Sequence, residues 1–261
     1  MTKHFPYLNK FKKSTEILKK IAEDAFNQNH YNKNSENILG ILVSAVKDET
    51  MDRKEAEGQI LNLLVAGHDT SATTLVWTLS HLSKSPDTWE LIKKESIEVF
   101  KHENSEDFVK KIMNAEITGK VIDEALRLYP AVWGTTRTAI KDVEIDNVFV
   151  KQKTIVLTSA YVSHRNPKYF YNPEEFIPER WHDGFKESLD QGVYFPFYMG
   201  QKKCLGDRFA TLEMKIILLL IANKMSLSLN SKFPEPHFST LLKIKNKVLM
   251  NIEMRKNEKL D

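Results

Sequence analysis

The segment from Asp52 to Ser83 constrains the fold most, because its pattern predicts one helix of roughly thirty residues. Apolar side chains recur along it at helical spacing, from Ile60 to Leu82. Asp52 followed by Glu55 resembles a capping box and indicates where this helix begins. Because the usual helix is much shorter, a helix of this length should cross the middle of a sizeable body.

The composition is that of an ordinary globular chain, with 261 residues, 41% hydrophobic and 28% charged. A net charge of +3 is too weak to argue for nucleic acid as a partner. No apolar run approaches the ~20 residues that a bilayer requires, and the N-terminus lacks the apolar region of a signal peptide. The single cysteine excludes an internal disulfide framework and fits a reducing compartment on the cytoplasmic side.

The remaining segments predict a mainly α chain with minor β structure, that is, an α+β fold. Helices are expected within residues 1–50, over the central 52–83, over 86–130 and over 206–225. Residues 131–196 read as short strands, with a turn at Asp146-Asn147, followed by an irregular stretch rich in proline. A C-terminal hairpin is expected over 238–255, centred on Asn246.

The central helix breaks local rules in the sequence Ala66-Gly67-His68-Asp69-Thr70. A glycine inside a helix costs about 1 kcal/mol relative to alanine, and Asp and Thr compete for backbone groups. One interpretation is a kink at a packing contact. The other is a ligand groove, in which Gly67 admits a group to the backbone, Thr70 bonds back to the Ala66 carbonyl, and Asp69 feeds protons.

Glu124 and Arg127 form a second unusual feature, because residues three apart share one face of a helix. A solvated surface pair of this kind contributes little to stability. The surrounding residues are largely apolar, however, so a buried network is the alternative.

The third feature is the loop FYMGQKKCLGDRFA, which contains Cys204. A lone cysteine is usually buried and inert. Here Lys202, Lys203 and Arg208 lie close by, and a helix is expected to start near Gly206. Cations and a helix N-terminus both favour a thiolate over a thiol, which makes a metal ligand or a nucleophile the alternative.

The partner residues that a nucleophilic cysteine or a zinc site would need are not recognisable in the sequence. No histidine stands in a recognisable protease-like context, and no cluster has the spacing of zinc ligands. A single protein thiolate suits a metal that brings its own equatorial ligands, and haem is that case. Gly200 and Gly206 would permit tight backbone geometry around the sulfur.

Four segments, taken in chain order, resemble motifs of the cytochrome P450 family of haem-thiolate monooxygenases. The resemblance extends over nearly the whole chain and corresponds to the C-terminal part of that fold. The motifs are Ala66-Gly67-x-Asp69-Thr70, Glu124-x-x-Arg127, Phe176-x-Pro178-Glu179-Arg180-Trp181 and Phe197-x-x-Gly200-x-Lys202-x-Cys204-x-Gly206.

The resemblance implies a role for each matching position. Cys204 would be the axial ligand of the iron of haem b, and Asp69 and Thr70 would manage proton delivery to dioxygen. Glu124, Arg127 and Arg180 would form a structural network under the haem, and residues 131–135 would line the substrate pocket. The remaining haem-binding positions would be Arg137 and Lys202 at the propionates, Phe197, Gly200 and Gly206 around the sulfur, and Ala66 and Gly67 in the groove.

The implied activity is insertion of one oxygen atom from O2 into a small lipophilic organic substrate, with electrons from a reductase or a ferredoxin. Alternatives are a haem-thiolate peroxygenase or isomerase, and a catalytically silent, haem-binding remnant. Lys202 stands where the family usually has arginine, so a weaker propionate contact is expected. Family members are longer at the N-terminus. The chain would then be one incomplete domain over 1–261 whose missing N-terminal half, carrying any membrane anchor, is a further partner.

Overall fold

The structure is a computed structural model that describes residues 6–30 and 37–255. Residues 1–5 and 31–36, which fall within the region 1–50 where helices are expected, lie outside this range, as do residues 256–261. Contacts divide the chain into two compact units, Met1–Asp69 and Thr70–Asp261, and each is described by itself. The helices of eight residues or more are α1 (Pro6–His30), α2 (Ile38–Lys47), α3 (Arg53–Leu82), α4 (Pro86–Phe100), α6 (Glu116–Leu128) and α9 (Asp207–Lys224).

The first unit contains α1, α2 and the beginning of α3. Its small core joins Ala22 and Phe26 of α1 to Leu42 of α2 and Ile60 of α3. The predicted cap of α3 is present, since the Asp52 carboxylate accepts a hydrogen bond from the Glu55 N–H at 2.7 Å. A local signal in the sequence therefore fixes the start of the longest helix.

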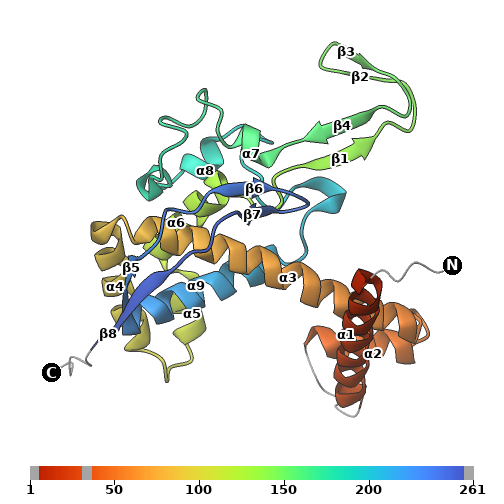
Figure 1. The fold of residues 1–261 in the computed structure, drawn as a ribbon, viewed down its shortest axis with the longest axis horizontal. Coiled ribbons are helices and arrows are strands. Elements are labelled where there is room, and N and C mark those ends of the chain that lie inside the picture. The colour runs from red at the N-terminus through yellow and green to blue at the C-terminus, as the bar shows by residue number, and fades with distance from the viewer. Residues whose placement is uncertain (1–5, 31–36, 256–261) are drawn as a thin grey trace. The chain divides into compact units, whose positions relative to one another are not determined.

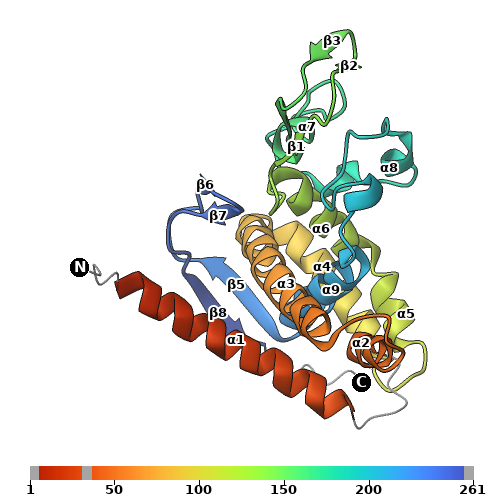
Figure 2. The ribbon, with the colours of Figure 1, turned by 90° about the vertical axis from the view of Figure 1, so that its right-hand side faces the viewer.

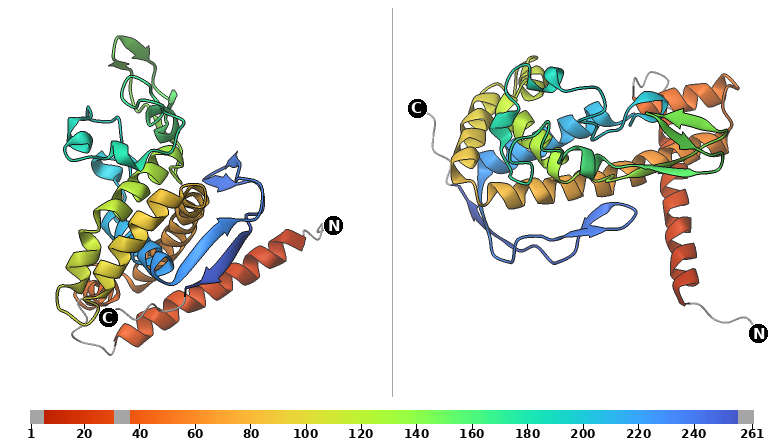
Figure 3. Two further views of the ribbon diagram at one scale, coloured as in Figure 1. Left: turned by 90° about the vertical axis from the view of Figure 1, so that its left-hand side faces the viewer. Right: turned by 90° about the horizontal axis from the view of Figure 1, so that it is seen from above.

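The second unit is organised around α9, which packs on α4, on the short α5 (Phe108–Met113) and on α6 (Figures 1 and 3). Ile92 of α4, Val121 of α6 and Leu218 of α9 are each fully buried in the core between these helices. The apolar stripes of α4 and α6 explain this packing, because each must be covered by another element.

The strands of the second unit form four separate two-stranded antiparallel sheets. β1 (Thr135–Thr138) pairs with β4 (Ile155–Thr158), and the hairpin of β2 (Val143–Ile145) and β3 (Val148–Val150) lies at their far end (Figure 1). Asp146 and Asn147 both adopt positive φ, 49° and 63°, so the predicted turn is confirmed.

The predicted hairpin centred on Asn246 is wrong. Asn246 lies between β7 (Leu242–Ile244), which pairs with β6 (Pro236–Phe238), and β8 (Met250–Met254), which pairs with β5 (Met225–Leu229) (Figure 2). Its side-chain oxygen accepts from the Glu235 N–H at 2.7 Å and so ties a loop. Alternating residues indicate a strand but do not identify its partner, and here the partner of β8 comes directly after α9.

Helices dominate the described residues and the sheets are small, as the predicted mainly α fold class requires. The short elements that remain are α7 (Ala160–Ser163), α8 (Phe185–Ser188), and the 3-10 turns η1 (Pro178–Arg180) and η2 (Gly200–Lys202). Over residues 6–30 and 37–255, no helix combines the length and the apolar character needed to cross a bilayer.

Candidate functional site

Cys204 lies in the turn between η2 and the start of α9, and its side chain is exposed. Its N–H donates to the Phe197 carbonyl at 2.9 Å, which closes the loop around the thiol. Tyr198 and Gly200 have φ of 56° and 68°. The left-handed conformation at position 200 accounts for a glycine there. Gly206 has an ordinary φ, and a Cβ added there would lie 3.8 Å from the Cys204 sulfur.

The charges near the thiol are partly neutralised within the loop. Lys203 Nζ lies 2.6 Å from an Asp207 carboxylate oxygen. This hydrogen bond from Lys203 is the main cause that lowers the pKa of Asp207. Lys202 and Arg208 are exposed. Of the three cations expected to favour a thiolate, one is therefore engaged by a carboxylate.

Arg137 lies on β1 with an exposed side chain. Its Nη1 donates to the Thr136 carbonyl at 2.9 Å and contacts the Thr135 hydroxyl at 3.1 Å. Burial raises the pKa of the Tyr198 phenol, and the charge of Arg137 opposes that shift. Arg137 is thus close enough to act electrostatically on the loop that contains Cys204.

The segment Ala66–Thr70 lies within α3, which is helical throughout Arg53–Leu82. Ala66, Gly67 and Asp69 are exposed, and Thr70 is half-buried. Nothing lies within 4 Å of a Cβ added at Gly67, so no close packing contact explains this glycine. The Asp69 carboxylate lies 3.1 Å from Nδ1 of His68.

Glu124, Arg127 and Arg180 lie together with fully buried side chains. Arg127 makes a two-pronged contact with the Glu124 carboxylate, through Nε and Nη2 at 2.9 Å each. Arg180 Nε reaches the same carboxylate at 3.0 Å. The carboxylate also accepts from the Trp181 indole at 2.9 Å and from the Ile177 N–H at 2.8 Å. Both oxygens of this buried carboxylate therefore accept hydrogen bonds, as burial of a charge requires.

His164 is a buried residue beside this network that carried no sequence signal. Its carbonyl accepts from Arg127 Nη1 at 2.9 Å. Its ring Nε2 accepts from the Phe195 N–H at 2.9 Å, in the segment that leads to Cys204. No spacing rule connects position 164 to position 195, so only the fold could identify this contact.

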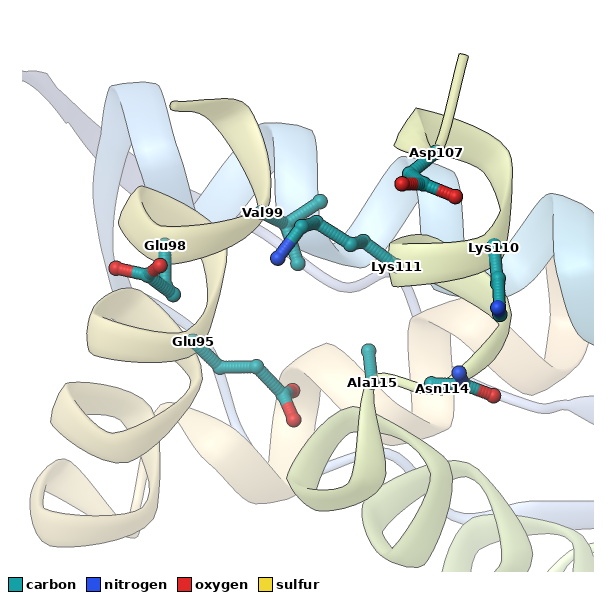
Figure 4. Close-up of a pocket in the computed structure, with 8 residues that line it drawn as sticks. All are labelled: Glu95, Glu98, Val99, Asp107, Lys110, Lys111, Asn114 and Ala115. Carbon is teal, nitrogen blue, oxygen red and sulfur yellow. The ribbon is translucent and has the colours of Figure 1, made fainter. Parts of the chain in front are cut away.

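A cavity of about 480 Å³ lies between α4, α5 and the start of α6 (Figure 4). Glu95 points toward the first turn of α6 and accepts from the N–H groups of Ile117 and Thr118, both at 2.9 Å. None of the predicted site residues lines this cavity. The carboxylate therefore serves as a cap for α6, and the cavity is separate from the cysteine loop.

The residues around Cys204 fit a haem group by their chemistry. No group of three or more His, Cys, Asp or Glu side chains is placed to hold a metal ion among the described residues. A lone thiol as donor suits a metal with its own equatorial ligands. Leu205 and Phe209, beside the thiol, are 96% and 68% exposed. This uncovered apolar surface matches the flat apolar face of a porphyrin.

Comparisons with known proteins agree on one family. The family model described as Cytochrome P450 matches residues 1–252. Human cytochrome P450 3A5 is 34% identical over 172 residues, which cover 66% of this chain and 34% of that protein. Cyclooctat-9-en-7-ol 5-monooxygenase of Streptomyces melanosporofaciens is 33% identical over 193 residues, covering 73% of this chain and 42% of that protein.

Solved structures with a similar fold are also cytochrome P450 proteins. A crystal structure of a cytochrome P450, CYP102L1, superposes with a TM-score of 0.82 at 25% identity and covers 96% of this chain. The match takes in 58% of that solved chain, so this chain spans only part of the length of the relatives it matches. On the family match over residues 1–252 and this fold, the chain belongs to the cytochrome P450 family.

Proposed function

We propose that this chain supplies the haem-binding part of a monooxygenase that inserts one oxygen atom of O2 into a small lipophilic substrate. The observation that carries the proposal is the cysteine loop. The only thiol of the chain is exposed, its N–H is fixed to the Phe197 carbonyl, and it is flanked by uncovered apolar side chains. Haem b, when bound, would supply the oxygen chemistry and accept electrons from a reductase or a ferredoxin.

The residues of the chain would then have distinct tasks. The Cys204 thiolate would be the axial ligand, and Arg137 would neutralise a haem carboxylate. The Lys202 ammonium, which is exposed, could add a second positive charge. Gly67, beside which nothing lies within 4 Å of an added Cβ, would admit a bound group to the backbone of α3. Glu124 and its two arginines would hold the preceding chain in place and take no part in the chemistry.

Proton delivery would fall to Asp69 and Thr70, which are consecutive residues of α3. The Thr70 hydroxyl can both donate and accept, and the Asp69 carboxylate can take a proton from solvent and pass it on. A peroxide-driven enzyme or an isomerase needs no such relay. The presence of both side chains therefore favours oxygen activation with electrons from a redox partner.

A carbon monoxide difference spectrum of the reduced, haem-supplied full chain tests the proposal. A Soret band of the thiolate-ligated type is expected, and Cys204→Ala should abolish it without changing the far-UV circular dichroism. A band that persists in Cys204→Ala would assign the ligand elsewhere. If the wild-type chain binds no haem at all, this function is not a property of the chain alone.

Turnover measurements separate the proposed monooxygenase from the peroxide-driven alternative. Product formation that needs NAD(P)H, a reductase and O2 supports the proposal. Product formation with peroxide alone, and none with the reductase system, would support a peroxygenase instead. Thr70→Ala should lower the reductase-dependent rate much more than the peroxide-dependent rate.

A further inference from the structure

His164 follows α7 directly and has no exposed surface. Its ring Nε2 accepts the Phe195 N–H, so Nε2 carries no proton and the neutral ring is protonated at Nδ1. Burial is the main cause that lowers the pKa of His164 to about 3, so the acceptor persists at physiological pH. The nitrogen that faces the segment leading to Cys204 is therefore the acceptor Nε2.

Ser163, the residue before His164, contacts the chain just before Phe195. The Ser163 hydroxyl lies 3.1 Å from the Val193 carbonyl and 3.3 Å from the Gly192 carbonyl. The end of α7 thus fixes residues 192–195 twice, once through a hydroxyl and once through an imidazole. The His164 ring also packs edge-on against the Phe195 ring, with centroids 5.3 Å apart.

The contacts continue in both directions from His164. Its carbonyl is held by Arg127, which is itself held by Glu124. Beyond Phe195, the Phe195 carbonyl accepts from the Tyr198 N–H at 3.0 Å. The Phe197 carbonyl, one residue earlier than Tyr198, accepts from the Cys204 N–H at 2.9 Å. An unbroken path therefore connects the buried carboxylate of α6 with the backbone of the cysteine.

We propose that His164 is a positioning residue for Cys204. Its Nε2 fixes the Phe195 N–H and thereby the turn whose Phe197 carbonyl holds the Cys204 N–H. The role at the iron rests on the proposed haem-thiolate function, whereas the role in placing the thiol does not. Without the acceptor, the buried Phe195 N–H loses its partner and the turn must rearrange to satisfy it.

Two polar substitutions of similar character separate this role from simple filling of space. The amide oxygen of His164→Gln can reach the place of Nε2, whereas that of His164→Asn is one methylene too short. His237→Asn, at an exposed position on β6, is the matched control. Far-UV circular dichroism and the urea midpoint identify conditions in which all the variants are folded.

The first measurement needs no haem. Cys204 is the only cysteine, so the rate of its alkylation by iodoacetamide in the folded full chain reports the environment of one thiol. We expect a several-fold change in this rate for His164→Asn, and a rate near wild type for His164→Gln and His237→Asn. Equal rates in the Asn and Gln variants would overturn the proposal.

The second measurement uses haem-loaded protein at matched haem content. The His164→Asn variant should show a smaller thiolate-type fraction in the carbon monoxide difference spectrum, and His164→Gln should restore it. A wild-type spectrum in His164→Asn would refute the role at the iron. If wild type itself lacks the thiolate band, the proposed function fails, while the alkylation rates still decide whether His164 positions the thiol.

Discussion

Replacing Glu124 with glutamine should destabilise this protein more than any surface change. The buried carboxylate accepts five hydrogen bonds, from Arg127 Nε and Nη2, Arg180 Nε, Ile177 N and Trp181 Nε1. An amide replaces one of the two oxygens by an N–H2 group that faces donors, and it leaves two buried guanidinium groups without a counter-charge.

The expected cost follows from these contacts. Removing one partner of a buried ion pair costs about 3–5 kcal/mol. Five charged hydrogen bonds at about 1.5–3 kcal/mol each would sum to more, but such contributions within one network are not additive. A whole domain is stable by only about 5–15 kcal/mol. We therefore expect Glu124→Gln to lower the free energy of unfolding by about 3–5 kcal/mol.

Urea unfolding, followed by tryptophan fluorescence and far-UV circular dichroism, measures this loss. Glu235→Gln is the control, because its ion pair with Lys245 is 61% and 64% exposed and should contribute less than about 1 kcal/mol. Trp181→Phe, which removes one donor and keeps the charge pairs, should lose about 1–3 kcal/mol and remain folded. If Glu124→Gln lies within the error of the surface control, the buried network does not stabilise the fold.

Two further predictions concern pH and backbone strain. Burial, followed by the charge of Lys84, lowers the pKa of His81 to about 4, so below pH 6.5 the unfolded chain binds a proton that the folded chain does not. The free energy of unfolding should therefore fall as the pH drops from 6.5 toward 4, with a slope of about 1.4 kcal/mol per pH unit from this group. Urea titrations at several pH values should show this slope in wild type and its loss in His81→Gln. The same substitution at the exposed His237 should leave the slope unchanged. Gly200→Ala, at φ 68°, should lower the free energy of unfolding in urea by about 1–2 kcal/mol. Gly67→Ala, at an open position in the middle of α3, should raise it by up to about 1 kcal/mol. Equal effects of the two substitutions would contradict the strain argument.

Features governed by neighbours in sequence were predictable. The start of α3 follows from Asp52, whose carboxylate caps the helix at Glu55, and the hairpin turn follows from Asp146 and Asn147, which tolerate positive φ. Glu124 and Arg127 were recognisable as a pair because one helical turn brings them together. Their burial was one of two alternatives, and packing against distant segments decided between them.

Features governed by long-range contacts were not predictable. The alternation in the C-terminal segment indicated strands, but β8 pairs with β5, about twenty residues earlier, and no local signal encodes that choice. His164 has no charged or metal-binding neighbour pattern, and its importance comes from a segment thirty-one residues away. Exposed placement of Ala66 to Asp69 could not be deduced either, because the helical pattern around them suggested burial.

The irregular segment before η1 shows why the buried network contains two arginines for one carboxylate. The carbonyl groups of this stretch have no strand or helix partner, and those that bond to the arginines lie in part-buried contacts, where a donor must replace water. Arg127 donates to the Pro173 and Glu175 carbonyls at 2.7 and 2.9 Å, and Arg180 donates to the Tyr171 carbonyl at 2.8 Å. The guanidinium groups thus donate the hydrogen bonds that a neighbouring strand would otherwise supply to these carbonyls. Glu124 sets their orientation, and their remaining N–H groups order the chain that leads to the cysteine loop.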